Sequence, residues 1–165
     1  MTFRRQSPKP GQESVWDYPR PPRLESVSES IQIWMGQLLL ASTSQAVRIL
    51  ETSHPPVYYL PEADIEMQFL QPSPGKRSYC EFKGQAHYVD FVYEDHYLPQ
   101  IGWGYRHPDK KYPQLAGRLA FYASRVTKAM VGDEVVQAQE GDFYGGWITS
   151  KIVGPFKGGP GTWGW

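Results

Sequence analysis

Two residues close together in the sequence, Cys80 and Lys83, could take part in chemistry. Cys80 is the only cysteine of the chain. A thiol becomes a nucleophile when a nearby cation lowers its pKa, but residues three apart on a regular strand point to opposite faces. Two interpretations stand: a nucleophile that a bend at Gly84 brings to Lys83, or a small buried core residue. Lys83 itself could supply a positive charge to an anionic ligand or lie on a solvated strand face.

Glu51 is the candidate general base. It ends an apolar run and precedes Pro55 and Pro56, which stop regular structure because proline cannot donate to a sheet. Sites favour strand ends and the loops that follow them, and a carboxylate there could accept a proton. The structural alternative is that Glu51 accepts hydrogen bonds that fix the loop. The chain has four histidines, all in predicted turns or on polar strand faces, so no nucleophile–base–orienter triad is evident: His54, His87, His96 and His107.

Aromatic residues make up 15% of the chain. Trp103 and Tyr105 flank Gly104, so strand periodicity places both rings on one face, where a flat heterocycle or a cation could stack. Most of the aromatic rings must belong to the core, but Tyr58 and Tyr59 could add to the same wall. The predicted ligand-binding residues are Glu51, Tyr58, Tyr59, Lys83, Trp103 and Tyr105, with Glu51 and Cys80 as catalytic candidates.

Short aromatic and β-branched runs between glycines and prolines are typical of a mainly β fold. Gly36-Gln37 and Gly132-Asp133 are predicted hairpin turns, and residues 72–76 are a predicted loop. Residues 114–118 could form one helical turn. The predicted strands are 31–35, 38–41, 46–51, 57–61, 65–69, 78–93, 101–105, 119–122, 126–130 and 134–137.

Composition excludes several classes of protein. Lys and Arg total 17, and so do Asp and Glu, so the basic excess of a duplex nucleic-acid binder is missing. One cysteine permits neither an intrachain disulfide nor a cysteine-rich zinc site, and no cofactor is predicted. The N-terminus lacks the apolar run of a signal peptide, and no stretch approaches the roughly 20 apolar residues of a membrane span. We therefore expect a cytoplasmic protein without membrane contact.

Three zones differ in composition. Residues 1–30 form an arm rich in Pro and Arg, residues 31–137 a β-rich domain, and residues 138–165 an extension rich in Gly and aromatics that must pack on the domain. Trp16 and Tyr18 could anchor the arm on its own domain. Alternatively, the arm could be a nucleic-acid-binding or signalling tail, or it could exchange between two copies in a homodimer.

Four blocks of the sequence resemble, in order and spacing, the domain-of-unknown-function family 427, sometimes labelled nucleotidyltransferase-like. The resemblance covers about residues 33–134. Phe82 stands where Trp or Tyr is common in that family, and Val89 where Trp often follows the tyrosine. Residues 141–147 resemble an extension seen in one branch, in cyanobacteria and plants. The four blocks are residues 51–61, 80–88, 103–108 and 115–122.

The resemblance implies a compact β-tent-like fold, in which two antiparallel sheets lean together with a cleft between them and helices are short turns at most. The family has no settled activity. Some proteins of similar shape hold zinc in paired Cys-x-x-Cys motifs, which a single cysteine cannot supply. Nucleotidyl transfer needs closely spaced carboxylates for Mg²⁺ and usually a Gly-rich turn that opens a helix. The sequence contains no Asp-x-Asp pair, so the transferase label finds no support.

Three functions follow as expectations. The first is the binding of a small polar or aromatic metabolite in an aromatic and polar cleft between the sheets. The second is a small hydrolase or transferase that uses Glu51 as base or Cys80 as nucleophile. The third is a structural or interaction module that acts through the N-terminal arm.

Overall fold

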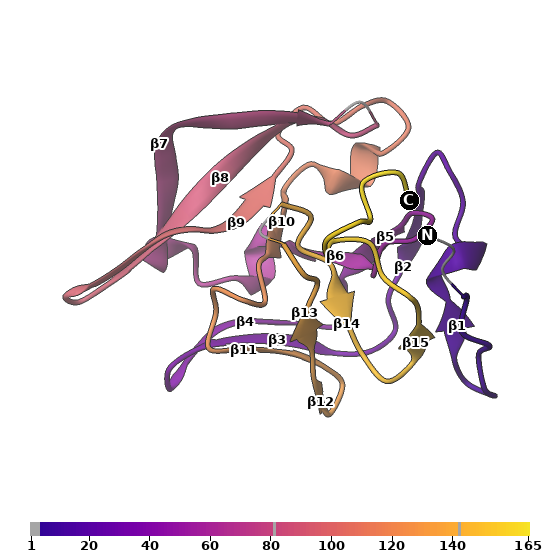
Figure 1. Cartoon of the computed structure of the whole chain (residues 1–165). Coiled ribbons are helices and arrows are strands. Elements are labelled where there is room, and N and C mark those ends of the chain that lie inside the picture. The colour runs from indigo at the N-terminus through magenta and orange to yellow at the C-terminus, as the bar shows by residue number, and fades with distance from the viewer. Residues whose placement is uncertain (1–3, 81, 142) are drawn as a thin grey trace.

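A computed structural model describes residues 4–80, 82–141 and 143–165 of the chain (Figure 1). Strands make up 45% of the residues and helical turns 8%. The predicted mainly β fold with only short helical turns is therefore confirmed. Within the described ranges, no helix is long and apolar enough to cross a membrane. The helical segments are 3₁₀ turns: η1 (Val15–Asp17), η2 (Glu62–Asp64), η3 (Met67–Phe69) and η4 (Pro113–Leu115).

The larger sheet has seven antiparallel strands in the order β2-β5-β6-β10-β9-β8-β7. Residues 23–26, which fall in the predicted arm, form its edge strand and pair with β5. Figure 1 shows the β8–β9 hairpin projecting beyond the rest of the molecule. The strands are β2 (Arg23–Ser26), β5 (Val47–Leu50), β6 (Val57–Pro61), β7 (Leu70–Cys80), β8 (Gly84–Tyr93), β9 (His96–Gly104) and β10 (Arg118–Phe121).

The smaller sheet has four antiparallel strands in the order β12-β11-β3-β4. Both predicted hairpin turns are confirmed. Gly36 (φ 59°) and Gly132 (φ 58°) begin them in the left-handed region, which glycine enters without steric cost. The strands are β3 (Ile31–Met35), β4 (Leu38–Thr43), β11 (Lys128–Val131) and β12 (Glu134–Val135).

Two short strand pairs involve the ends of the chain. In the N-terminal arm, β1 (Glu13–Ser14) runs parallel to β15 (Ile152–Val153) of the C-terminal extension. The extension also contributes β14 (Trp147–Ile148), which pairs with β13 (Gln137–Ala138). The Trp16 and Trp165 rings meet edge to face with centroids 5.5 Å apart. The arm and the extension therefore pack against each other as well as against the sheets.

The core is divided by the larger sheet. One cluster fills the space between the two sheets and includes Ile33 of β3 and Phe121 of β10. A second cluster covers the opposite face of the larger sheet and includes Tyr59, Ala120 and Trp103. Side chains alternate across a strand, so neighbouring residues of β6 and β10 enter different clusters.

Three local predictions were wrong. Residues 65–69 do not form a strand, because only Ile65 bridges Ala41 and the chain then coils into η3. Residues 72–76, predicted as a loop, lie within β7, where the register with β8 shifts between Pro72 and Arg77. Residues 78–93, predicted as one strand, are a hairpin, since β7 ends at Cys80 and β8 begins at Gly84. The alternation of polar and apolar residues continues through such a turn, so it does not reveal the reversal.

Candidate functional site

A cavity of about 280 Å³, here called the aromatic cavity, opens on the face of the larger sheet that carries the second core cluster. Its walls come from the β7–β8 hairpin, strand β9, the residues that directly follow β9 and β10, the loop after β5 and the C-terminal extension. Its lining residues are Glu51, His54, Ser78, Tyr79, Cys80, Phe82, Lys83, Ala86, Tyr88, Trp103, Tyr105, Tyr122, Phe143, Tyr144 and Lys157.

The structure brings most of the predicted site residues together. Glu51, Lys83, Trp103, Tyr105 and the catalytic candidate Cys80 all line the aromatic cavity. Trp103 and Tyr105 share a face of the sheet, as their spacing predicts, and Gly104 lies between them against β10. These five residues thus lie in one cavity, but their position alone assigns no role to any of them.

The two predicted tyrosines of β6 do not line this cavity. Tyr59 is fully buried behind it, with its ring centroid 6.4 Å from that of Trp103 and 6.3 Å from that of Tyr105. Tyr58 points to the other face, where its ring stacks on Trp147 at 5.1 Å. Because adjacent strand residues alternate, only one of the pair could ever face the site.

Cys80 and Lys83 line the same cavity because the chain reverses between them. Cys80 pairs with Gly84 across the hairpin, and Gly84 has a φ of 109°, which favours glycine. The Lys83 carbonyl accepts a hydrogen bond from the Asp109 amide at 2.9 Å, which fixes the turn on the loop after β9. Cys80 and Lys83 therefore do not lie on one regular strand, and the rule that residues three apart point to opposite faces does not apply to them.

Glu51 contacts two side chains, neither of which sequence reasoning assigned to the site. Its Oε2 lies 3.5 Å from Arg20 Nε and 3.6 Å from His54 Nε2. The Arg20 guanidinium also donates to the Thr52 carbonyl at 2.9 Å. The sequence predicts His54 in a turn and gives no signal that it lies beside Glu51. Glu51 is the single carboxylate among the described lining residues, and Arg20 of the N-terminal arm partly neutralises its negative charge.

His54 is buried and neutral at physiological pH. Burial, followed by the positive charges of Lys157, Lys83 and Arg20, lowers its pKa to about 3. The Gln139 amide nitrogen lies 3.4 Å from His54 Nδ1. If that amide donates to Nδ1, the imidazole proton resides on Nε2 and points toward Glu51.

Both ends of the chain hold the loop that carries Glu51 and His54. Ser53, at its centre, is fully buried and has a φ of 72°, an uncommon conformation for a residue other than glycine. Its amide donates to the Val15 carbonyl at 3.0 Å, and its carbonyl accepts from the Lys157 amide at 2.9 Å. The Thr52 hydroxyl donates to the Tyr18 carbonyl at 2.5 Å. The arm and the extension thus fix the geometry of the loop from two sides.

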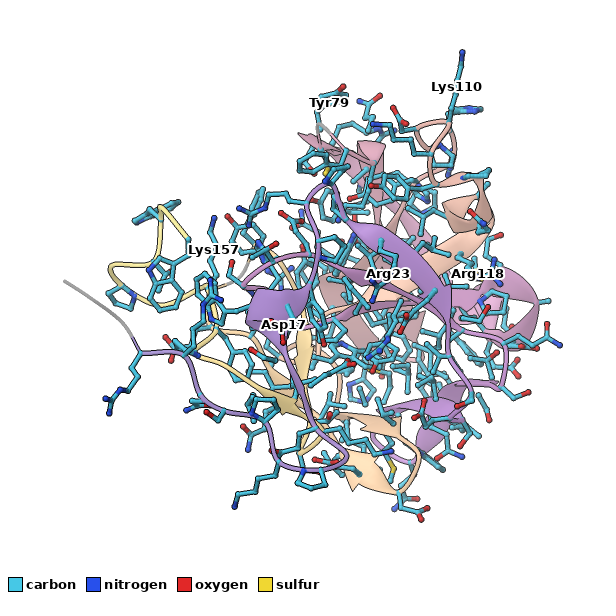
Figure 2. The ribbon with its side chains drawn as sticks, turned by 90° about the vertical axis from the view of Figure 1, so that its right-hand side faces the viewer. Asp17, Arg23, Tyr79, Lys110, Arg118 and Lys157 are labelled. Atoms are coloured by element: carbon cyan, nitrogen blue, oxygen red, sulfur yellow. The ribbon has the colours of Figure 1, made fainter. Side chains whose placement is uncertain are left out.

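The C-terminal extension supplies lining residues that sequence reasoning missed. Tyr144 meets the His54 ring at 4.6 Å, and Phe143 and Lys157 complete this wall. Figure 2 shows Lys157 on the extension and Tyr79 on the β7–β8 hairpin. Gly145 has a φ of 72°, and a Cβ there would overlap the Trp103 indole. The glycine and aromatic composition of the extension indicated packing, but only its contacts assign it to this cavity.

Two ammonium groups face the aromatic rings of the cavity. Lys83 Nζ lies 5.8 Å from the Tyr105 ring centroid, and Lys157 Nζ lies 5.4 Å from that of Tyr144. Neither lysine forms an ion pair with a carboxylate in the part of the chain that the structure describes. The arrangement joins flat aromatic surfaces to positive charge.

The predicted position of the cleft, between the two sheets, requires correction. A mainly apolar groove of about 520 Å³ does lie between the ends of the sheets, with Met35 and Leu38 on one side and Phe91 and Leu98 on the other. None of the predicted site residues lines it. The predicted site residues that line the aromatic cavity lie on the other face of the larger sheet. The space between the two sheets is largely filled by the first core cluster.

Comparison with known proteins is consistent with the family resemblance of the sequence. Across the described residues, no group of three or more His, Cys, Asp or Glu side chains is placed to hold a metal ion. No curated protein matches the chain. The family model described as "Domain of unknown function (DUF427)" matches residues 23–132. That segment contains Glu51, Lys83 and Trp103 but neither Tyr144 nor Lys157. Since the match covers more than half of the 165 residues, the chain belongs to the DUF427 family.

Proposed function

We propose that this protein binds a small metabolite in the aromatic cavity. The observation that carries the proposal is the convergence there of rings, ammonium groups and one carboxylate from segments that lie far apart in sequence. Ligand sites typically combine apolar and aromatic walls with a few polar groups. The volume of about 280 Å³ lies just below the range of roughly 300–1,000 Å³ that is usual for such sites, which favours a small ligand.

The proposal is tested by identifying what the purified protein carries. Native protein is denatured, and the released small molecules are identified by mass spectrometry, with Trp103→Leu protein treated in parallel. We expect a molecule that the wild type releases and the variant does not. Trp34→Leu is the matched control, because Trp34 lies on β3 and does not line the cavity. A molecule retained equally by all three proteins would place its site elsewhere.

The second candidate is a small hydrolase or transferase. It is favoured by the placement of Glu51 and Cys80, a possible base and a possible nucleophile, in one cavity. Glu51→Gln keeps the shape of the side chain and removes its basicity. Under this alternative, the variant binds the substrate but no longer turns it over. An unreactive Cys80 thiol in alkylation experiments would rule out that residue as the nucleophile.

For location, we propose the reducing cytoplasm. The proposal is supported by the free, half-buried thiol of Cys80, since unpaired cysteines are typical of reducing compartments. Fractionation of cells that express the full chain tests it, and recovery in an oxidising compartment would contradict it.

A further inference from the structure

Among the residues that the structure describes, positive charges outnumber negative ones in the lining of the aromatic cavity. Lys83 and Lys157 both line it, whereas Glu51 is the only described carboxylate among its walls. Glu51 is already paired with Arg20 at 3.5 Å. Two ammonium groups therefore remain without an ion-pair partner among the described residues, in a partly enclosed space where charges interact more strongly than in water.

The pKa of His54 depends on the charges around the cavity. After burial, the largest influences on its pKa are Lys157, Lys83 and Arg20, and all three disfavour a positive imidazole. Three cations therefore lie close enough to the ring to disfavour its protonation, even though the Glu51 carboxylate lies 3.6 Å away. Neutral His54 adds no further charge but keeps one N–H group that can donate a hydrogen bond.

The aromatic rings determine the shape of what fits. Trp103 and Tyr122 lie 4.5 Å apart between centroids, and Tyr105 belongs to the same cluster. Such walls favour flat molecules. A cationic ligand would have to compete with Lys83 over Tyr105 and with Lys157 over Tyr144, and both lysines would repel it.

We infer that the aromatic cavity selects a small planar organic anion, whose carboxylate or phosphate group is held by Lys83 and Lys157 and whose ring lies against Trp103 and Tyr105. This inference rests on the proposed binding function and adds the ligand class. Because Lys157 lies outside the segment that matches the family, 23–132, half of the anion-binding charge comes from the C-terminal extension.

Four probes that share one benzene ring test the inference: benzoate, phenyl phosphate, neutral benzamide and cationic benzylamine. Affinities are measured by calorimetry with the full chain at low ionic strength. Hydrogen bonds to charged groups are stronger than those to neutral groups, so we expect both anions to bind at least about tenfold more tightly than benzamide. Benzylamine should bind most weakly. Raising the salt concentration should reduce the preference for the anions.

Lysine variants locate the effect. Lys83→Met and Lys157→Met keep much of the side-chain bulk, and each should weaken benzoate binding about tenfold while leaving benzamide unchanged. Lys128→Met is the matched control, because its ammonium lies 5.3 Å from the Trp34 ring centroid, outside the cavity.

The outcomes separate this inference from the function on which it rests. Equal affinity for benzoate and benzamide, or lysine variants that behave like Lys128→Met, would overturn the anion preference and leave metabolite binding intact. Failure of all four probes would overturn the ligand class. The binding function fails as well only when the native protein releases no small molecule on denaturation.

Discussion

The imidazole Nε2 of His54 lies 3.6 Å from the carboxylate Oε2 of Glu51, yet the pair is not an ion pair at neutral pH. Burial and the neighbouring cations keep His54 neutral, and Arg20 supplies the positive charge next to Glu51. The cavity therefore contains a neutral donor beside a paired carboxylate. Among the described lining residues, the unpaired positive charges are those of Lys83 and Lys157.

The low pKa of His54 predicts that the fold weakens as the pH falls. In the unfolded chain the imidazole takes up a proton near pH 6.5, but in the folded protein only near pH 3. Below pH 6.5 the unfolded state thus binds more protons, so the stability present above that pH is lost progressively toward pH 3. Between pH 7.5 and pH 5, urea unfolding should show a loss about 2 kcal/mol larger for wild type than for His54→Gln. Equal losses would contradict the neutral state. His87, whose pKa burial also lowers, contributes to both proteins.

Gln139 should be essential for the stability of the loop region. Its amide donates to the Lys157 carbonyl at 2.7 Å and accepts from the Gly146 amide at 3.0 Å, and the side chain is buried. Gln139→Leu leaves both backbone groups without partners, at a cost of about 2–4 kcal/mol. Gln137→Leu, at an exposed neighbouring position, should cost less than about 0.5 kcal/mol. Similar values for the two variants in urea unfolding would contradict this prediction.

Gly145→Ala should disturb the cavity through Trp103. The alanine would have to adopt a left-handed conformation (φ 72°), which is unfavourable for it, and its methyl group would overlap the indole ring. Gly117 has nearly the same φ, 73°, but open space around it, so Gly117→Ala carries only the backbone cost of about 1–2 kcal/mol. We expect Gly145→Ala to lose at least about 1 kcal/mol more than this control and to shift the tryptophan fluorescence. Equal destabilisation would mean that the ring moves aside freely.

Removing the Tyr59 hydroxyl should leave the fold as stable or more stable. This buried group makes no hydrogen bond of ordinary geometry among the described residues. Burial is the main reason that its pKa is raised, and the nearby polar groups of Trp103 and Tyr105 oppose that rise only in part. Tyr59→Phe removes a polar group that folding transfers from water without compensation. Tyr112→Phe is the contrasting variant, because the Tyr112 hydroxyl donates to the Pro22 carbonyl at 2.6 Å. That variant should lose about 1 kcal/mol. A melting temperature that falls equally in both would point to an unrecognised partner of Tyr59.

Local signals in the sequence predicted much of the fold correctly. The glycines at residues 36 and 132 identify hairpin turns because the left-handed conformation is a property of the turn itself. The shared face of Trp103 and Tyr105 follows from strand periodicity. The hairpin between Cys80 and Gly84 was missed because alternation looks the same on both sides of a reversal. Residues 65–69 alternate like a strand, but Ile65 alone bridges Ala41.

The sequence by itself determined the mainly β fold, the family and several residues that line the cavity, because strand periodicity and turn chemistry act over a few neighbouring residues. Only the tertiary structure decided that Tyr59 lies behind the cavity while Tyr58 faces the other core cluster. Only it placed His54 beside Glu51 and brought Tyr144 and Lys157 to the same wall. Those neighbours are set by the packing of the arm and the extension against the loop after β5. Such contacts between distant segments depend on the whole fold.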